Sequence, residues 1–168
     1  GLIAMVDHLL VNHPGAFAGC WALAPDVVDF HDYQQVDLYA DPLQNLYRDP
    51  AGERRPIARV DGRPQLWYDD FTRMDDVLGQ GGQLRSFEAV FSPRGDDGLP
   101  RRMYDRATGQ VDREVVEAWR AYDLAHLLRQ RWPESAGSWA GKLRVTAGGE
   151  DTFYLEGAVR RLAELLRG

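Results

Sequence analysis

The stretch RVTAGGEDTFYLEG, residues 144–157, contains the change of pattern on which our prediction of the fold rests. Residues 141–147 have the composition of a core strand, and residues 155–166 place leucine and valine at the spacing of an amphipathic helix. Asp151 lies between these segments, after two glycines and Glu150. In open α/β sheets, ligands and catalytic groups gather at the carboxyl ends of the strands. Asp151 is therefore the first candidate for a functional residue.

A related pattern is present at the start of the sequence. Residues 2–11 carry apolar side chains at spacings of three and four, as in an amphipathic helix. Pro14 and Gly15 favour a turn, and residues 17–24 form a short apolar run that is typical of a strand buried on both faces. The order of helix, turn and buried strand predicts the α/β fold class, with a parallel sheet and flanking helices.

A long insertion, about residues 26–140, separates two predicted core segments, residues 1–25 and 141–168. It is rich in Asp, Arg, Pro, Gly and aromatic residues. Because parallel strands can be joined by a crossover of about 12 residues, we expect the insertion to form a cap-like region. Pro133 is expected to end its last helix and to begin a loop. The predicted elements are a β-ribbon over residues 48–71 with turns at 50–52 and 61–62, a helix over 71–79, a strand pair over 86–109 turning at 95–98, and a helix over 112–131.

The composition of the chain argues against several kinds of partner. Its 168 residues carry a formal net charge of −6, whereas nucleic-acid binding depends on clustered Lys and Arg. Cys20 is the only cysteine, so neither an internal disulfide nor a multi-cysteine zinc site is expected. The longest apolar run is shorter than the roughly 18 residues of a membrane span. We expect no nucleic-acid partner, no membrane span, no cofactor and no metal.

Two roles are open to Asp151. Its carboxylate could accept the Nδ1–H of a histidine, which sets the tautomer of the imidazole and stabilises the imidazolium that forms when it takes a proton from a serine. It could instead cap the following helix, with Thr152 beside it. Glu150 is the alternative candidate for the acid, and the spacing of these residues leaves both roles open.

Other polar and aromatic groups have a functional and a structural interpretation. The segment DFHD, residues 29–32, places two carboxylates around His31, which could bind a metal or belong to a loop after a strand. His13 is expected to pack in a turn, and His126 to lie on a helix. Five aromatic residues of the insertion either line an acyl or aromatic pocket or hold the insertion to the core: Trp67, Tyr68, Phe71, Phe87 and Phe91.

Four segments resemble the C-terminal part of α/β-hydrolases of the esterase family that is related to enterochelin esterases. Residues 1–30 are similar to the segment that follows the nucleophile elbow, with its HP turn and its strand ending in Ala-Pro. GGEDTFYLEGAVRRL, residues 148–162, resembles the acid-bearing loop and its helix. NLYRDPAGERRP and residues 84–112 resemble the insertion of a bacterial subgroup. The resemblance covers essentially the whole chain.

The resemblance implies a serine hydrolase that acts on small-molecule carboxylic esters, with Asp151 as the acid of the triad. On this resemblance, Gly1 is the last glycine of the elbow. We expect the sequence to be a fragment that lacks chain at both ends. The order of the triad in this fold is serine, acid, histidine. No histidine follows Asp151, and none of Ser86, Ser92, Ser135 and Ser138 lies in G-x-S-x-G. These residues alone are therefore expected to be inactive, and the alternative is a non-catalytic binding protein on the same scaffold.

Overall fold

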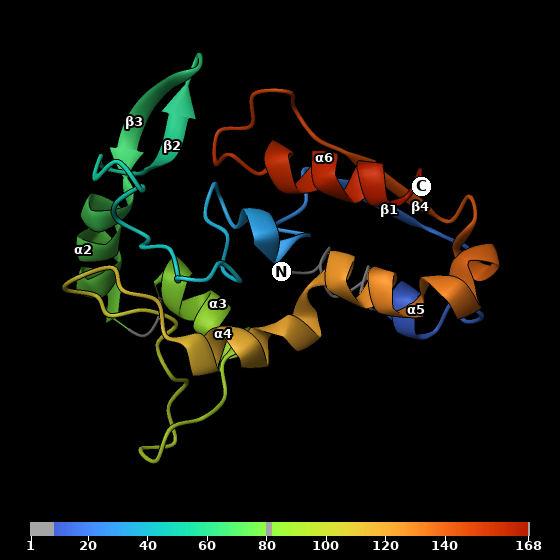
Figure 1. The fold of residues 1–168 in the computed structure, drawn as a ribbon, viewed down its shortest axis with the longest axis horizontal. Coiled ribbons are helices and arrows are strands. Elements are labelled where there is room, and N and C mark those ends of the chain that lie inside the picture. The colour runs from blue at the N-terminus through green and yellow to red at the C-terminus, as the bar shows by residue number, and fades with distance from the viewer. Residues whose placement is uncertain (1–8, 80–81, 168) are drawn as a thin grey trace. The chain divides into compact units, whose positions relative to one another are not determined.

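The computed structural model describes residues 9–79 and 82–167 (Figure 1). They fold as two compact units, which are described separately below: residues 9–35 with 121–167, and residues 36–79 with 82–120. The strands are β1 (Cys20–Leu23), β2 (Pro56–Val60), β3 (Arg63–Trp67) and β4 (Leu143–Thr146). The helices are α2 (Tyr68–Leu78), α3 (Gln83–Phe91), α4 (Arg113–Trp119), α5 (Leu124–Trp139) and α6 (Glu156–Leu165), with 3-10 helices η1 (Phe30–Asp32) and η3 (Arg120–Tyr122).

The first unit contains a small parallel sheet, in agreement with the predicted α/β class. β1 pairs with β4, with Cys20 opposite Leu143 and Leu23 opposite Thr146. Both strands lie where the sequence places the core strands. Of the helix predicted over residues 2–11, residues 9–11 are helical and the rest lies outside the described residues.

The prediction that the first strand is buried on both faces is wrong for the part of the chain that the structure describes. Successive side chains of a strand point to opposite faces of the sheet. Cys20 and Ala22 are buried, whereas Trp21 and Leu23 are 65% and 67% exposed. A strand of parallel sheet normally has both faces covered, and here the described residues cover one.

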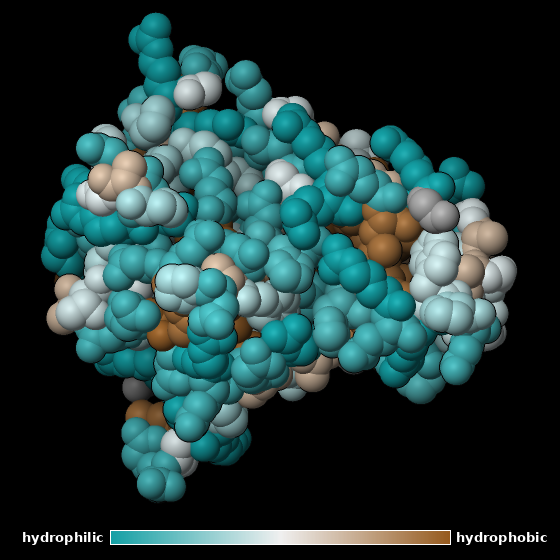
Figure 2. Space-filling view, viewed as in Figure 1, coloured by the Kyte–Doolittle hydropathy of each residue, from teal (hydrophilic) through white to brown (hydrophobic). Residues whose placement is uncertain are grey.

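An apolar cluster built mainly by α5 and α6 packs against the sheet through Leu143 and Val145 of β4. Figure 1 shows these two helices side by side within the unit, and Figure 2 shows hydrophobic side chains between them. The sequence predicted α6 from its periodic leucines, and Ala158 and Leu162 of that helix are fully packed in the cluster. The other buried members are Val11, Val28, Leu124, Ala125, Leu127, Leu128 and Trp139.

The single helix predicted over residues 112–131 is instead α4, η3 and α5 in succession. Asp112, where the predicted helix begins, caps α4 by accepting the N–H groups of Glu114 and Val115. A second cap, Asp123, begins α5 by accepting the N–H of His126 at 3.1 Å. The carboxylate of Asp123 is also buried and accepts the N–H of Phe30 at 3.1 Å. The helix restarts at Asp123 because this contact with η1 requires a residue outside helical geometry there.

Pro133 does not end α5, and the predicted loop over residues 134–139 is helical. The helix continues through the proline to Trp139. Proline in a helix interior removes one hydrogen bond and costs about 3 kcal/mol. The continued helix places Trp139 in the apolar cluster, where it is 4% exposed, and burial of its apolar surface acts against that cost.

The second unit contains the predicted β-ribbon. β2 and β3 are antiparallel, and the two residues between them, Asp61 and Gly62, both have positive φ, at 49° and 71°. This is the conformation that Asp-Gly favours in a tight hairpin. α2 follows β3 directly and ends at Gly79, the predicted stop. The turn predicted at residues 50–52 is closed by the N–H of Gly52 on the carbonyl of Asp49 at 2.9 Å.

The strand predicted from residue 86 is wrong, because residues 83–91 form α3. Leu84, Arg85 and Glu88 are the buried residues of this helix, at helical spacing. Glu88 accepts the backbone N–H of Met103 at 2.9 Å, and the helical spacing places it on the same buried face as Leu84 and Arg85. The predicted turn is present, with Gly98 donating to the carbonyl of Gly95 at 2.9 Å.

Four buried charges lie at the centre of the second unit. The guanidinium of Arg106 donates to Asp75 Oδ2 at 3.3 Å and to Glu88 Oε2 at 3.2 Å. Arg85 pairs with the same carboxylate of Glu88. All four side chains are at most 7% exposed. Two cations and two anions balance one another, as buried ionised groups must.

Arg106→Met is expected to destabilise this unit. Asp75 and Glu88 would remain buried with less compensation, so the free energy of unfolding should fall by about 3 kcal/mol or more. Urea denaturation of the wild type and the variant measures the change. Arg94→Met, at an exposed arginine of the same unit, is the control and should change stability by less than about 0.5 kcal/mol. Equal effects of the two substitutions would contradict the role given to Arg106.

Candidate functional site

The carboxyl ends of β1 and β4 bring two loop segments to one edge of the parallel sheet. The ladder extends to this edge, where Ala24 donates its N–H to the carbonyl of Thr146 at 2.7 Å. Residues 24–35 follow β1, and residues 147–155 follow β4. The two segments contact each other where Gln34 Nε2 donates to the carbonyl of Phe153 at 3.2 Å. We define this edge, with both segments, as the candidate site.

Asp151 organises the second of these segments. Its Oδ1 accepts the N–H of Phe153 at 2.8 Å and that of Leu155 at 3.3 Å. Leu155, the residue immediately before α6, makes no capping bond with its own side chain. Asp151 therefore does not cap α6 as predicted: it closes a turn in the loop before the helix, and both N–H groups that it binds precede Glu156. A carboxylate has about four acceptor positions, so these bonds are compatible with a further donor.

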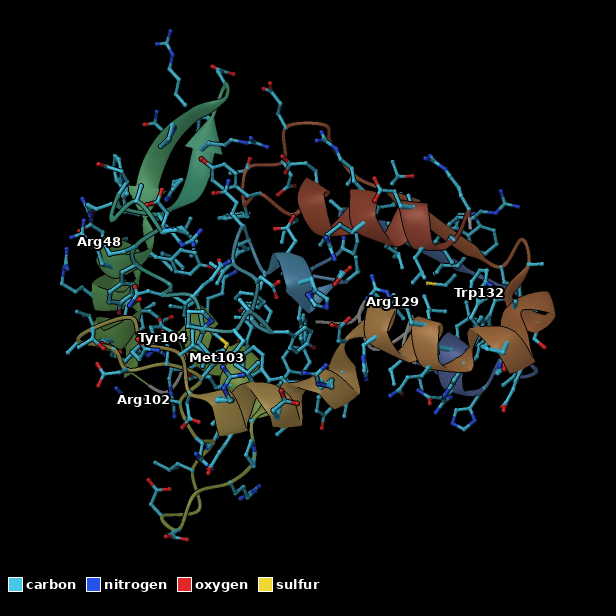
Figure 3. The ribbon with its side chains drawn as sticks, viewed as in Figure 1. Arg48, Arg102, Met103, Tyr104, Arg129 and Trp132 are labelled. Atoms are coloured by element: carbon cyan, nitrogen blue, oxygen red, sulfur yellow. The ribbon has the colours of Figure 1, made fainter. Side chains whose placement is uncertain are left out.

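Asp29 is the buried carboxylate of the first segment, and two arginines hold it. Its Oδ1 accepts the N–H of His31 at 3.0 Å. Its Oδ2 lies 3.1 Å from Arg129 on α5 and 3.1 Å from Arg161 on α6. A fully buried carboxylate requires such partners. Figure 3 labels Arg129 on α5.

These contacts explain why the segment DFHD is a junction between elements. Asp29 ties η1 to two helices, and no group of three His, Cys, Asp or Glu side chains is placed to hold a metal in residues 9–79 and 82–167. The sequence singled out this motif but not its arginine partners. Arg129 and Arg161 lie 100 and 132 positions after Asp29 in the chain, and no local pattern links them to it.

Asp32 is the second acid of this segment and packs against the first turn of α6. A Cβ built on Gly157 would lie 1.9 Å from its Oδ2, so the absence of a side chain at Gly157 makes room for it. Its Oδ1 accepts the N–H of Gln35 at 2.8 Å. Burial raises the pKa of Asp32, as do Asp29 and Glu156, whereas the Gln35 N–H and Arg161 act in the opposite direction.

Strained backbone is concentrated at the candidate site. Four residues with side chains have positive φ in its two segments: Ala24 at 44°, Gln34 at 50°, Gln35 at 74° and Tyr154 at 58°. In the described part of the chain, one further such residue is known, Asp61 of the β-hairpin. Strained conformations of this kind persist where surrounding contacts impose them, and they cluster at functional sites. This observation marks the edge independently of Asp151.

The remaining candidates lie elsewhere. Ser86 is on α3 and Ser92 ends it, where it accepts a hydrogen bond from Trp119 Nε1 at 2.9 Å. Ser135 and Ser138 are on α5, and His126 is in its first turn. The carbonyl of His13 closes a turn with Ala16, as predicted from the HP sequence, whereas His8 and Gly1 lie outside the described residues. None of these serines occupies a strand-to-helix turn.

The aromatic residues of the insertion pack against one another within the second unit. Phe87 stacks on Phe91 with ring centroids 6.3 Å apart, and Phe91 meets Trp119 edge-on at 5.3 Å. Tyr68 is buried, and Trp67 lies under the guanidinium of Arg54. These contacts stabilise the second unit itself. They bear on neither prediction for the aromatic residues, a ligand pocket or an attachment of the insertion to the core.

Comparisons of the chain with protein families, with characterised proteins and with solved structures found no match. Among residues 9–79 and 82–167, no helix has the length and apolar character needed to cross a membrane. The functional argument therefore rests on the residues of the candidate site.

Gly157→Ala should destabilise the first unit, whereas Gly137→Ala should not. The added methyl group at Gly157 displaces Asp32, which we expect to cost about 1–3 kcal/mol. Gly137 is in α5, and a Cβ built there meets nothing within 4 Å, so alanine should raise stability by about 0.5–1 kcal/mol. Chemical denaturation of both variants and the wild type measures the two changes in the free energy of unfolding. If Asp32→Ala does not relieve the effect of Gly157→Ala, the proposed contact is wrong.

The pH dependence of stability should contain a contribution from Asp32. Since its pKa is raised above the ordinary value of 3.8 on folding, the folded state binds this proton more tightly, and stability falls as pH rises from 3.8 through the folded-state pKa. Asp32→Asn keeps an acceptor for the Gln35 N–H and removes the titration. The free energy of unfolding of the variant relative to wild type should increase across that pH range and then level off. If the difference in the free energy of unfolding between the variant and wild type does not change with pH, the assignment is wrong. Asp96→Asn, which removes one exposed carboxylate, is the control.

Proposed function

We propose that the chain is the acid-bearing part of a serine-dependent carboxylic-ester hydrolase, built on an α/β-hydrolase sheet, and that Asp151 is the acid of its catalytic triad. The observation that carries the proposal is the position of Asp151 at the carboxyl end of β4, beside the parallel strand β1. This is the edge of an α/β sheet at which catalytic groups are found. The concentration of strained residues at the same edge supports it.

The role of Asp151 is to orient a histidine. Its carboxylate accepts the Nδ1–H, which leaves Nε2 free to take the proton of the serine as the hydroxyl attacks the ester carbonyl. The charge of Asp151 then stabilises the imidazolium until the proton passes to the leaving alcohol. The bonds from the N–H groups of Phe153 and Leu155 hold the carboxylate in a fixed direction, so its orientation needs no rearrangement during the reaction.

The proposal requires that the nucleophile and the histidine come from chain outside these residues. The sequence has no G-x-S-x-G, and no histidine follows Asp151. On this proposal the serine would come a few residues before Gly1, as the resemblance of residues 1–30 to the segment after the elbow implies. The substrate class is a small-molecule carboxylic ester, in line with that resemblance.

A second candidate function is a binding protein on the same scaffold, without catalysis. The bonds that Asp151 Oδ1 accepts from the N–H groups of Phe153 and Leu155 are local, which is what a loop-organising residue requires. On this alternative, the carboxylate charge itself has no chemical task, and an amide could replace it.

Asp151→Asn separates the two functions, because asparagine retains the oxygen that accepts the Phe153 and Leu155 N–H groups. In the protein expressed from its complete reading frame, we expect kcat for 4-nitrophenyl esters to fall by about four orders of magnitude, with an unchanged melting temperature. Asp151→Ala should lower both the rate and the melting temperature, since it also removes the acceptor.

Glu150→Gln is the matched control, since it removes the neighbouring carboxylate and should leave kcat within about twofold. Unchanged turnover in Asp151→Asn would refute the assignment of the acid. A wild-type protein that neither cleaves a panel of esters nor reacts with a fluorophosphonate probe would favour the binding protein instead.

A further inference from the structure

A rigid loop in the second unit, residues 105–110, forms one wall of a surface hollow. Asp105 Oδ1 accepts the N–H groups of Ala107 and Thr108, both at 2.8 Å, and the hydroxyl of Thr108 at 3.1 Å. The ends of the loop are joined by the N–H of Asp105 on the carbonyl of Gln110 at 2.8 Å. These bonds fix the loop from within.

Residues from a distant part of the unit fix the same loop from behind. Tyr47 donates its hydroxyl to the carbonyl of Arg106 at 2.6 Å, and Asn45 Nδ2 donates to that of Thr108 at 3.0 Å. Gly109 has φ of 77°, and a Cβ at that position would lie 2.6 Å from the ring of Tyr47. The wall is therefore held in one conformation before any ligand arrives, which lowers the entropic cost of binding.

The hollow lies along residues 101–112 and has a volume of about 710 Å³. A volume of this order suits a small organic molecule. Arg101, Arg102 and Arg106 line it together with Asp105 and Asp112. Guanidinium groups are the side chains best matched to carboxylate and phosphate groups, because their N–H donors form a planar fork.

The two carboxylates of the lining are already engaged by the protein. Asp105 accepts hydrogen bonds from Ala107 and Thr108 of its own loop. The N–H and hydroxyl of Thr108 and the N–H of Ala107 lower the pKa of Asp105, and Arg102 lowers it by a smaller amount. Asp112 accepts two N–H groups at the start of α4 and pairs with Arg101 at 2.9 Å. Neither acid is placed to compete strongly for a further guanidinium.

Arg102 differs from the other two arginines of the hollow. Arg101 is held by Asp112 and by Glu114, and Arg106 by Asp75 and Glu88. Arg102 is exposed and forms no hydrogen bond or ion pair with residues 9–79 or 82–167. Figure 3 labels it beside the buried Met103 and Tyr104, on the segment that carries the hollow. Its donors are available to a ligand.

We propose that this hollow binds a small organic anion, with the guanidinium of Arg102 contacting a carboxylate or phosphate group of the ligand. Arg101 supplies a second guanidinium in a fixed position. The loop of residues 105–110 forms a wall of the hollow that has its shape before the ligand binds. The site is formed by residues of the second unit alone, so it does not depend on the role proposed for Asp151.

Titration of the isotopically labelled protein with citrate and, separately, with inorganic pyrophosphate tests the proposal by NMR at constant ionic strength. We expect saturable shifts of the amide signals of residues 101–112 at millimolar or lower concentration of at least one probe. Arg102→Gln should weaken that binding by about tenfold or more, through the loss of a charge-assisted contact. Saturation by citrate alone identifies a carboxylate ligand, and saturation by pyrophosphate alone a phosphate ligand.

Arg94→Gln is the matched control, because Arg94 is an exposed arginine of the same unit outside the lining of the hollow. It should leave the dissociation constant within about twofold of wild type. The proposal is overturned if neither probe gives saturable shifts. It is also overturned if both arginine variants weaken binding equally, since that result indicates a general attraction of charge. The melting temperature of Arg102→Gln should match wild type, as expected of an exposed side chain.

Discussion

The parallel pairing of β1 with β4 is the constraint on which the first unit depends. Parallel strands end at the same edge of a sheet, so the segments that follow them must meet there. The ladder is complete from the N–H of Cys20 on the carbonyl of Lys142 to the N–H of Ala24 on that of Thr146, both at 2.7 Å. The acid-bearing loop and the segment after β1 are therefore neighbours in space, although most of the chain separates them in sequence. The placement of Asp151 at the candidate site follows from this pairing.

Buried carboxylates connect the elements around that sheet. Asp123 joins the start of α5 to η1, and Asp29 joins η1 to both α5 and α6. A carboxylate buried without partners would cost several kcal/mol, so each of these contacts specifies one arrangement of the elements around it. The second unit uses the same principle in its balanced cluster around Arg106. In both units, the polar interior fixes geometry while apolar burial supplies the main driving force.

Three differences between the predicted and the observed helices and strands have one kind of cause. The strand expected from residue 86 is α3, because Glu88 reaches Met103. The helix expected to end at Pro133 continues, because Trp139 is buried. The long helix after Asp112 breaks at Asp123, because that side chain binds the backbone of Phe30. Each outcome rests on a contact with a residue far along the chain, which outweighs a local preference of a few kcal/mol at most.

The sequence by itself determined the features that neighbouring residues control. These are the two core strands, the helix after Asp151, the hairpin turn at Asp61 and Gly62, and the cap at Asp112, since periodicity and turn chemistry act over a few residues. It also singled out Asp151 as the candidate acid. Only the tertiary structure decided which charges meet: Asp29 with Arg129 and Arg161, and Arg106 with Asp75 and Glu88. Such pairs depend on the folded path of the chain, because the Coulomb energy of two charges depends on their distance in space and on burial.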